Sequence, residues 1–226
     1  MMPYLAALLT DSLILNEQMM KDLFVAVTGN IGAGKSTLTS MLANSFGWQP
    51  FYEANAENPY LADFYEDMPR WSFQSQIFFL SKRLEHHRQL VDYPGSVVQD
   101  RTVYEDAQIF ARNLYKQGRM TDRDFETYCR LYEAIASFLP PPDLIIYLQA
   151  STPKLLQHIE QRGRDYEQNI EAEYVEQLNT LYDEWISDWT YCPVLYVPMD
   201  EVNFQHNVSD YMKIVAQIEE KTGLRV

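Results

Sequence analysis

The sequence predicts an α/β protein in which five strands form one parallel sheet with helices on both faces. Short apolar runs rich in β-branched residues alternate with longer segments whose apolar residues recur every three or four positions. The runs are typical of buried strands, and the longer segments are typical of amphipathic helices. Strands that alternate with helices pair in parallel through right-handed crossovers, and these crossovers place helices on both faces of the sheet.

Each strand candidate is short and bounded by residues that favour turns or helix ends. The run LFVAVT is followed by glycine, and DLIIYLQ follows three consecutive prolines that stop the preceding helix. The last candidate, PVLYVP, begins and ends with proline. The five expected strands are residues 23–28, 48–53, 96–100, 143–149 and 193–198.

Helical periodicity fills the intervals between these strands. Leu38 and Leu42 share one face of the first helix, and Thr121 is the expected N-cap of a later helix. Pro153 suits the first turn of another, where its missing N–H costs nothing. The expected helices cover residues 38–46, 71–91, 104–117, 122–138, 153–162, 172–191 and 208–221.

Composition narrows the classes of protein that the chain can be. Its 226 residues are 46% hydrophobic and 22% charged, and they show no repeat or linker, which predicts one domain over 21–226. The net charge of −14 argues against nucleic-acid partners, since phosphate contacts need many Lys and Arg. Cys129 and Cys192 are too few for a disulfide framework and suit a cytoplasmic location. Residues 1–20 are expected to be an extension outside the core, too short to span a membrane.

The clearest chemical signal is the segment GNIGAGKS at residues 29–36, which fits the pattern G-x-x-x-x-G-K-[ST]. A buried strand precedes it and an amphipathic helix follows, so successive backbone N–H groups can converge on phosphate oxygens at a helix N-terminus. Lys35 is expected to reach the β- and γ-phosphates, and Ser36 to ligate Mg²⁺. The expected ATP-binding residues are Gly29, Asn30, Ile31, Gly32, Ala33, Gly34, Lys35, Ser36 and Thr37.

Charged residues follow the second and third strands, at the edge of the sheet where this loop should lie. Glu53 ends the second strand, and Asp100 and Arg101 end the third. In open α/β sheets, ligands bind beyond the carboxyl ends of the strands. A carboxylate there can take the proton of an acceptor hydroxyl as it attacks the γ-phosphoryl group, and a neighbouring guanidinium can neutralise the developing charge. These residues predict a phosphoryl-transfer enzyme.

Six short segments occur in an order and spacing that resemble the deoxynucleoside kinases, and most closely the bacterial deoxyadenosine and deoxyguanosine kinases. The resemblance extends over residues 23–200 and implies a P-loop kinase fold, ATP as donor, Mg²⁺ and a deoxynucleoside acceptor in nucleotide salvage. It also implies a homodimer. The matching segments are GNIGAGKST (29–37), Glu53 followed by ENPYL (57–61), RWSF (70–73), QDRTVYED (99–106), PPDLIIYL (141–148) and RGR (162–164).

The same resemblance implies roles at the phosphoryl-transfer centre. Glu53 would be the base for the 5′-hydroxyl, with Arg101 as its neighbour at that hydroxyl, and Asp100 would lie near Mg²⁺. A lid at about 162–170 would close over the triphosphate and carry Arg162 and Arg164, which would stabilise the transferring group together with Lys35.

The nucleoside would be held by a second group of residues. Tyr65 and Glu167 match the pair that holds the sugar 3′-hydroxyl. The spacing of the other candidates agrees with a shared site, because residues seven apart, or four apart, lie on one face of an α-helix. The residues matched to the base are Gln76, Arg83, Asp106 and Phe110, with Phe110 stacking on it.

The acceptor base can be argued from hydrogen-bond donors and acceptors. A glutamine carboxamide matches the N6 amine and a ring nitrogen of adenine, and Asp106 needs an exocyclic amine. Thymine offers O4 instead, which would leave a buried carboxylate unpaired at a cost of about 1–3 kcal/mol. Deoxyadenosine is therefore favoured, while Arg83 could donate to guanine, so deoxyguanosine and deoxycytidine stay open.

Other readings compete with this one. A nucleoside monophosphate kinase would need cations at its acceptor phosphate, which Glu53 would repel. A GTPase would need an N-K-x-D motif, which the sequence lacks. A non-catalytic protein would not need Lys35, Glu53 and Arg101 together. Two departures from the family pattern concern the Ala54-Asn55 loop and His158, which replaces an arginine often found beside the ATP adenine in animal relatives.

Overall fold

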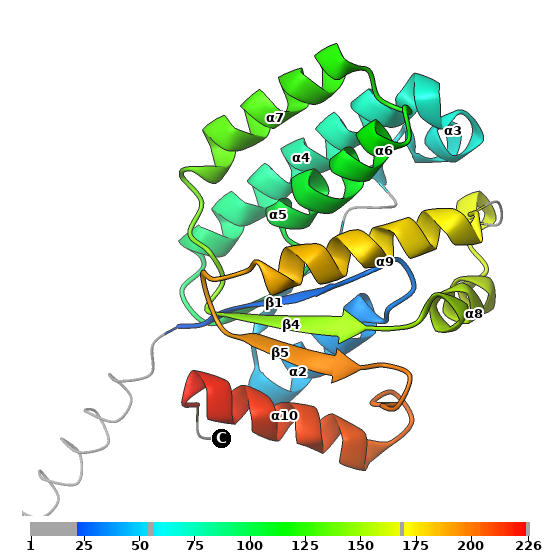
Figure 1. Ribbon diagram of the computed structural model, residues 1–226. Coiled ribbons are helices and arrows are strands. Elements are labelled where there is room, and N and C mark those ends of the chain that lie inside the picture. Colours follow the sequence, from blue (N-terminus) through cyan, green and yellow to red (C-terminus); the bar gives the residue numbers. More distant parts are fainter. Residues whose placement is uncertain (1–21, 54–56, 168–169, 225–226) are drawn as a thin grey trace, which may run out of the picture.

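A five-stranded parallel sheet in the order β2-β3-β1-β4-β5 forms the centre of the protein, which confirms the predicted fold class (Figure 1). The computed structural model describes residues 22–53, 57–167 and 170–224, so the extension expected at 1–20 lies outside the described residues. The strands are β1 (Phe24–Gly29), β2 (Gln49–Phe51), β3 (Val97–Asp100), β4 (Leu144–Gln149) and β5 (Val194–Pro198).

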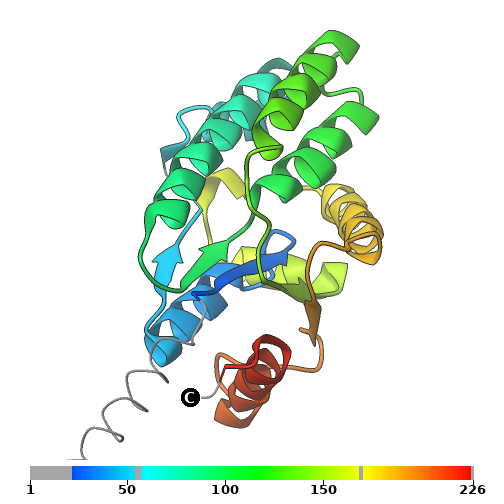
Figure 2. The ribbon, with the colours of Figure 1, turned by 90° about the vertical axis from the view of Figure 1, so that its left-hand side faces the viewer.

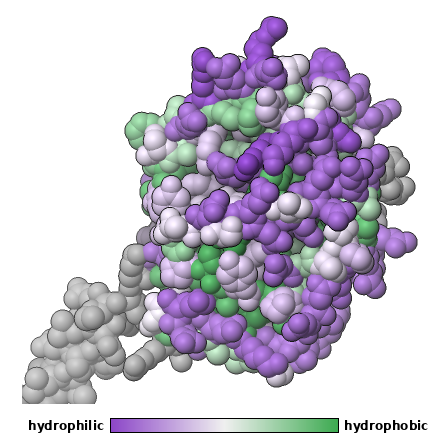
Figure 3. Space-filling model, in the orientation of Figure 1, coloured by the Kyte–Doolittle hydropathy of each residue, from purple (hydrophilic) through white to green (hydrophobic). Residues whose placement is uncertain are grey.

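The central strands are buried on both sides. All six residues of β1 are buried, as are five of the six residues of β4. This burial explains why both strands are almost continuously apolar, as is usual for parallel strands covered on two faces. The edge strand β5 directly follows Pro193 and ends at Pro198. Prolines at the two ends of an edge strand hinder its pairing with another chain. Figure 3 shows a largely hydrophilic surface broken by small hydrophobic patches.

Helices cover both faces of the sheet and define two apolar cores (Figures 1 and 2). One core packs under α2 and α10, and the other lies under α4, α7 and α9. No helix among the described residues is long and apolar enough to cross a membrane. The helices are α2 (Lys35–Phe46), α3 (Leu61–Glu66), α4 (Met68–Asp92), α5 (Val103–Glu105), α6 (Arg112–Lys116), α7 (Asp122–Ala136), α8 (Thr152–Arg162), α9 (Ala172–Ser187) and α10 (Val208–Thr222).

The helices differ from expectation in places where a local interaction decides the boundary. Helix α4 begins before residue 71 because the side chain of Asp67 accepts a hydrogen bond from the Arg70 N–H and Pro69 occupies the first turn. The six-residue α3 is too short to show a periodicity. The helix expected at 104–117 contains a π-helix, Asp106–Ala111, between α5 and α6.

The strand register brings the predicted residues to one edge. Val27 of β1 lies opposite Asp100 of β3, and Phe51 of β2 lies opposite Gln99. The turn after β1 therefore begins at the same edge of the sheet where β3 ends at Asp100 and where the chain leaves β2 toward Glu53. Gly29, at the start of this turn, has a φ of 142°, and a β-carbon there would lie 2.7 Å from the carbonyl oxygen of Leu148. The close approach of β4 thus requires glycine at this position.

Candidate active site

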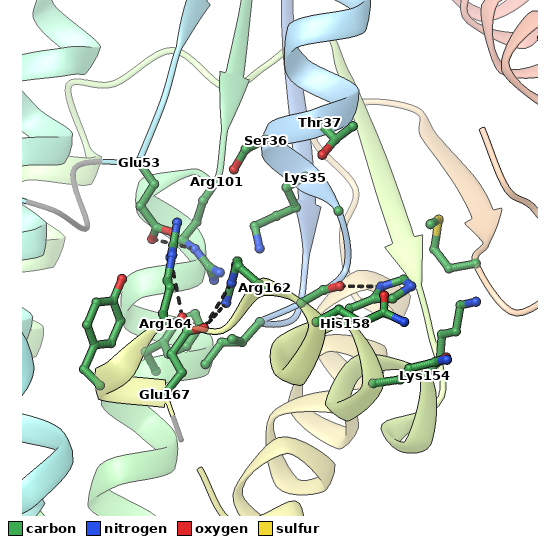
Figure 4. A pocket seen from close by; sticks show the side chains of 18 of the residues that line it. Lys35, Ser36, Thr37, Glu53, Arg101, Lys154, His158, Arg162, Arg164 and Glu167 are labelled. Atoms are coloured by element: carbon green, nitrogen blue, oxygen red, sulfur yellow. Dashed lines mark hydrogen bonds and ion pairs between the residues drawn. The ribbon is translucent and has the colours of Figure 1, made fainter. Parts of the chain in front are cut away.

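A cavity of about 670 Å³ opens at the carboxyl edge of the sheet (Figure 4). Its walls come from the P-loop (residues 29–36), α3, α4, the π-helix, α8, the segment that follows α8, and the loop between β5 and α10. Fifteen of the predicted site residues line it: Ile31, Gly32, Gly34, Lys35, Ser36, Thr37, Glu53, Tyr65, Gln76, Arg101, Asp106, Phe110, Arg162, Arg164 and Glu167. The other five lie behind the wall: Gly29, Asn30, Ala33, Arg83 and Asp100.

The P-loop presents its lysine to this cavity. Gly32 and Gly34 have φ angles of 82° and 94°, and α2 begins immediately afterwards at Lys35. The Nζ of Lys35 donates to the carbonyl oxygen of Asn30 at 2.9 Å. Burial lowers the pKa of Lys35 to about 8, and Arg101 contributes in the same direction. The position of the Lys35 ammonium group is thus fixed at the cavity, where an anion would offset its buried charge.

The side chain of Asn30 makes structural contacts. Its Nδ2 donates to the carbonyl oxygen of Val175 at 2.9 Å and to Oδ1 of Asn179 at 2.7 Å. Asn179 in turn donates to the carbonyl oxygen of Ala150. The P-loop is therefore tied to α9 and to the end of β4 through two carboxamide side chains.

Ser36 and Asp100 provide oxygen atoms that fit a magnesium ion. The Oγ of Ser36 donates to Oδ2 of Asp100 at 2.5 Å. Within the described residues, Oδ1 of Asp100 is buried and has no hydrogen-bond partner, and burial, joined by Glu53, raises the pKa of this carboxyl group. Mg²⁺ prefers oxygen ligands and usually needs only one or two carboxylates when phosphates complete its shell. No cluster of three or more His, Cys, Asp or Glu that could hold a metal occurs in the part of the chain that is described.

Glu53 is held by two arginines from different elements. Its Oε1 accepts a hydrogen bond from Nη2 of Arg83 at 2.8 Å, and Nε of Arg101 lies 2.7 Å from the same oxygen as an ion pair. Side-chain exposure is 14% for Glu53, 4% for Arg83 and 3% for Arg101, so this is a nearly buried charge cluster. Figure 4 shows Lys35 pointing into the space between this cluster and the segment after α8.

Arg83, which was expected to contact the base, does not line the cavity and lies behind its wall. Its Nε donates to Oδ2 of Asp106 at 3.1 Å, and its Nη1 donates to the carbonyl oxygen of Asp100 at 3.2 Å. Together with the bond to Glu53, these contacts tie α4 to the ends of β2 and β3. In this arrangement Arg83 supports the wall of the cavity from behind.

Gln76, Asp106 and Phe110 form another part of the cavity wall. Gln76 is 3% exposed, and within the described residues its Oε1 has no hydrogen-bond partner. Burial raises the pKa of Asp106 to about 6, although Arg83 acts in the opposite direction. The π-helix carries both Asp106 and Phe110, and such segments are frequent at functional sites. The guanidinium of Arg101 lies 4.4 Å from the centre of the Phe110 ring.

Arg162 and Arg164, the arginines predicted to lie in the lid, both contact Glu167, the carboxylate predicted to hold the sugar. Nε and Nη2 of Arg162 donate to Oε2 of Glu167 at 3.0 and 2.5 Å, and Nη1 of Arg164 lies 3.5 Å from Oε1. Gly163, with a φ of 64°, ends α8 between the two arginines. The ring of Tyr65 stacks on that of Tyr166 with centroids 5.9 Å apart. Residues 168–169 of the expected lid lie outside the described residues.

His158 binds the P-loop directly. Its Nδ1 lies within hydrogen-bonding distance, 2.9 Å, of the carbonyl oxygen of Gly32, and the side chain lines the cavity from α8. The Ala54-Asn55 loop, where the family pattern also changes, lies outside the described residues.

Two site residues, Glu105 and Tyr182, were not predicted. Both are buried, and both contact Arg101 or its immediate neighbours. The pattern Thr-x-x-Glu at 102–105 is a capping box, in which Glu105 accepts a hydrogen bond from the Thr102 N–H at 2.7 Å, and it could have revealed Glu105. Tyr182 lies 81 residues from Arg101 and carries no local signal.

The sequence is similar to those of known proteins over most of its length. Residues 25–222 match the deoxynucleoside kinase family. The chain is 39% identical over 200 residues to the deoxyadenosine/deoxycytidine kinase of Bacillus subtilis, covering 88% of this chain and 92% of that protein. It is 37% identical over 202 residues to the deoxyguanosine kinase of the same bacterium, covering 87% and 96%.

Solved structures extend the similarity to the fold. The deoxyadenosine kinase of M. mycoides with bound dATP superposes with a TM-score of 0.78 at 30% identity, covering 87% of this chain and 99% of that chain. The same enzyme with the products dCMP and a flexible dCDP gives a TM-score of 0.80 at 30% identity and covers 88% and 100%. The fold is thus that of the P-loop kinases. The matches in sequence and structure together show that this chain belongs to the deoxynucleoside kinase family of ATP-dependent phosphotransferases.

Proposed function

We propose that the protein transfers the γ-phosphoryl group of ATP to the 5′-hydroxyl of a deoxynucleoside, with deoxyadenosine as the preferred acceptor. The observation that carries the proposal is the cavity itself. It joins the P-loop, the Glu53–Arg101 pair and the Gln76–Asp106 wall in one space of about 670 Å³. That volume lies within the usual range for small-molecule sites. One end suits a triphosphate and the other suits a nucleoside.

Base recognition rests on two acceptor groups in the wall. Oε1 of Gln76 has no partner among the described residues, and Asp106 lines the same wall. Both therefore call for donors on the ligand, and a buried acceptor left unpaired costs about 1–3 kcal/mol. Adenine presents an exocyclic amine beside a ring-nitrogen acceptor, and the amide of Gln76 can meet both with one donor and one acceptor. Phe110 would stack on the base.

Deoxycytidine is the second candidate acceptor. Cytosine also places an exocyclic amine beside a ring-nitrogen acceptor, so the same wall can pair with it. Among similar proteins, one B. subtilis relative is named a deoxyadenosine/deoxycytidine kinase, and the M. mycoides deoxyadenosine kinase is known with products of deoxycytidine. A purine is larger and would fill more of the cavity, which favours deoxyadenosine.

At the phosphoryl-transfer end, the proposal gives Glu53 the role of base. Arg83 and Arg101 both contact Oε1, so they orient the carboxylate before the hydroxyl arrives. Glu53 then takes the proton of the 5′-hydroxyl as the oxygen attacks the γ-phosphorus. Lys35, whose side chain points into the cavity (Figure 4), would bind the phosphate oxygens whose charge increases during transfer.

Magnesium fits the proposal through the oxygen atoms of Ser36 and Asp100. The ion would neutralise charge on the triphosphate when bound. The side chains around Glu53 include four buried or nearly buried carboxylates and three buried cations. An added cation would therefore offset an excess of negative charge. The carboxylates are Glu53, Asp100, Glu105 and Asp106, and the cations are Lys35, Arg83 and Arg101.

In the proposal, the lid at 162–170 changes partners when both substrates bind. Tyr65 and Glu167 would hold the sugar 3′-hydroxyl, and Arg162 and Arg164 would turn from Glu167 to the transferring phosphoryl group. The ion pairs of these arginines with Glu167 keep the cationic side chains at the cavity until a phosphate competes for them.

The proposal also includes one domain over 21–226, a cytoplasmic location and a homodimer. Cys129 and Cys192 form no disulfide, which suits a reducing compartment. Helix α7 carries the exposed Leu131, and Phe138 just beyond it is 84% exposed, so this region offers apolar side chains to a second copy. A mass of two chains in analytical ultracentrifugation would support the homodimer, and a mass of one chain would contradict it.

A phosphate-transfer assay tests the proposed function. Mg²⁺–ATP is offered with each of the four deoxynucleosides and with their 5′-monophosphates. Deoxyadenosine should give the highest kcat/KM, deoxycytidine should follow, thymidine should be poor, and the monophosphates should remain unphosphorylated. A monophosphate as the better acceptor would remove Glu53 from the role of base and favour a nucleoside monophosphate kinase.

The raised pKa of Asp106 predicts a pH dependence of substrate selection. As the pH falls below about 6, Asp106 takes up a proton and can no longer accept freely from the exocyclic amine, so kcat/KM for deoxyadenosine should fall. Asp106→Asn should be slower and should lose this acidic limb. The measurement is kcat/KM from below to above about pH 6 for both proteins.

The sign of the linkage separates this effect from acid unfolding. Because the pKa of Asp106 is higher in the folded chain than in the unfolded chain, the folded chain binds more protons between about pH 4 and pH 6, and this group makes it more stable as the pH falls. Protonation of Asp106 should thus reduce activity without itself destabilising the fold. An identical acidic limb in Asp106→Asn would assign the effect to another group, such as Asp100.

A further inference from the structure

Arg101 occupies a backbone conformation that residues with a side chain rarely adopt. Its φ is 66°, and among the described residues it is the one non-glycine residue with a positive φ. The left-handed region is disfavoured when a β-carbon is present, and such strain persists only where surrounding contacts determine the geometry. The surroundings of Arg101 therefore indicate what its geometry is for.

Two buried side chains hold the end of the guanidinium that faces away from Glu53. The Nη1 of Arg101 donates to the hydroxyl oxygen of Tyr182 at 2.5 Å, and this hydroxyl donates to Oε1 of Glu105 at 2.9 Å. Glu105 is fully buried, and its Oε2 accepts from the Thr102 N–H at 2.7 Å and from the Thr102 hydroxyl at 3.2 Å. The chain of contacts thus ends on the backbone directly after Arg101.

The order of these contacts explains how the guanidinium keeps its direction. The Nη1 of Arg101 is 3.6 Å from Oε1 of Glu105, so this carboxylate oxygen is near the guanidinium. The hydrogen bond that Oε1 accepts comes from the hydroxyl of Tyr182. A neutral hydroxyl in that place fixes Nη1 without offering a second full charge at contact distance. Nε stays 2.7 Å from Oε1 of Glu53, and the ring of Phe110 supports the guanidinium plane at 4.4 Å.

We propose that Tyr182 and Glu105 are positioning residues that hold the guanidinium of Arg101 against Glu53 in the geometry needed for phosphoryl transfer. The proposal rests on the proposed function, in which Arg101 acts beside the base at the 5′-hydroxyl. Tyr182 lies on α9 and Glu105 on α5, so neither touches the reacting atoms, and both act through Arg101.

Tyr182→Phe removes the hydroxyl and keeps the ring. We expect kcat for deoxyadenosine to fall by about tenfold or more, because a displacement of about 1 Å in a positioned group can cost up to roughly 10²-fold. The KM for ATP should stay within about twofold, since the P-loop is not touched. Glu105→Gln, which weakens the acceptor of the same hydroxyl, should reduce kcat in the same direction.

Tyr147→Phe is the matched control. Tyr147 is also a buried tyrosine, its ring stacks on Tyr182 with centroids 6.0 Å apart, and its hydroxyl donates to Asp183 at 2.9 Å. The Tyr147→Phe variant therefore removes one buried hydroxyl from the same aromatic stack, and this hydroxyl has no direct link to Arg101. Its kcat should remain within about twofold of the unaltered protein. A similar loss of kcat in Tyr147→Phe and Tyr182→Phe would overturn the proposal.

A double-mutant cycle with Arg101→Lys separates this proposal from the proposed function. If Tyr182 acts through Arg101, then Tyr182→Phe should change kcat by less than about twofold in the Arg101→Lys background. Full additivity would overturn the positioning role while leaving Arg101 in the mechanism. An Arg101→Lys protein with unchanged kcat would overturn both. If Tyr182→Phe does not fold, the cycle is made with Glu105→Gln, and the same outcomes decide.

Discussion

Replacing Glu53 by glutamine should lower kcat by a factor of about 10² or more, while deoxyadenosine still binds with an affinity within a few-fold of the original. Glutamine keeps the size of the side chain, and its carbonyl oxygen can still accept from Arg83 and Arg101, which now meet Oε1 of Glu53. It cannot take up the proton of the 5′-hydroxyl. Steady-state phosphoryl transfer gives kcat, and isothermal calorimetry gives the dissociation constant of the nucleoside.

Glu57→Gln provides the control for this change. Glu57 is four positions further along the chain, and its side chain is 59% exposed and pairs with Lys82 outside the cavity. The same chemical substitution there should leave kcat unchanged. An unaltered kcat in Glu53→Gln would rule out the carboxylate as the base. A loss of nucleoside binding equal to the loss of kcat would instead indicate that Glu53 serves to bind the acceptor.

Much of this centre could be predicted because parallel strands end at one edge of their sheet. Glu53 and Arg101 are 48 positions apart in the sequence, yet their strand-end positions alone place them together, and their side chains are in contact at 2.7 Å. The P-loop pattern similarly located Lys35 at the start of α2. Both inferences depend on local sequence and on a topological rule, and neither requires details of packing.

Depth within the protein is less accessible to such reasoning. Gln76 and Arg83 share a face of α4, as their spacing predicts, but seven residues separate them by about 10 Å along the helix axis. Gln76 therefore reaches the cavity while Arg83 meets Glu53 and Asp106 behind its wall. A helical wheel shows direction around the axis and not position along it, so the two residues looked equivalent in the sequence.

Side-chain partners that join distant elements could not be predicted for a different reason. Tyr182 on α9 contacts Arg101 only because the crossover from β4 to β5 lays that helix over the sheet (Figure 1). The π-helix that carries Asp106 and Phe110 is equally absent from the hydrophobic pattern, because its apolar residues also fit an α-helix. The pairing of Arg162 with Glu167 depends on the fold of a short turn after α8.

Lys35→Met should lower kcat by about 10²- to 10³-fold and weaken ATP binding, since one preformed charge at the transferring phosphoryl group is lost. The same change should raise the free energy of unfolding. The buried lysine has a pKa near 8 instead of 10.5, so between these pH values the unfolded chain binds more protons than the folded one. The contribution of Lys35 to the stability of the unaltered protein therefore increases with pH in that window, and at pH 7 the protein still bears the cost of the buried charge.

Denaturant unfolding at pH 7 and pH 9, together with ATP kinetics, checks both parts of the Lys35 prediction. Lys35→Met should be the more stable protein at pH 7, and the difference should narrow at pH 9, where Lys35 is largely neutral. Lys213→Met is the control, because the side chain of Lys213 is 71% exposed and does not line the cavity. It should alter neither kcat nor the pH trend. A less stable Lys35→Met protein would mean that the surrounding carboxylates stabilise the charged lysine in the folded chain. An activity loss together with a gain in stability would show that the P-loop keeps its lysine for the phosphate it binds, at the expense of the fold.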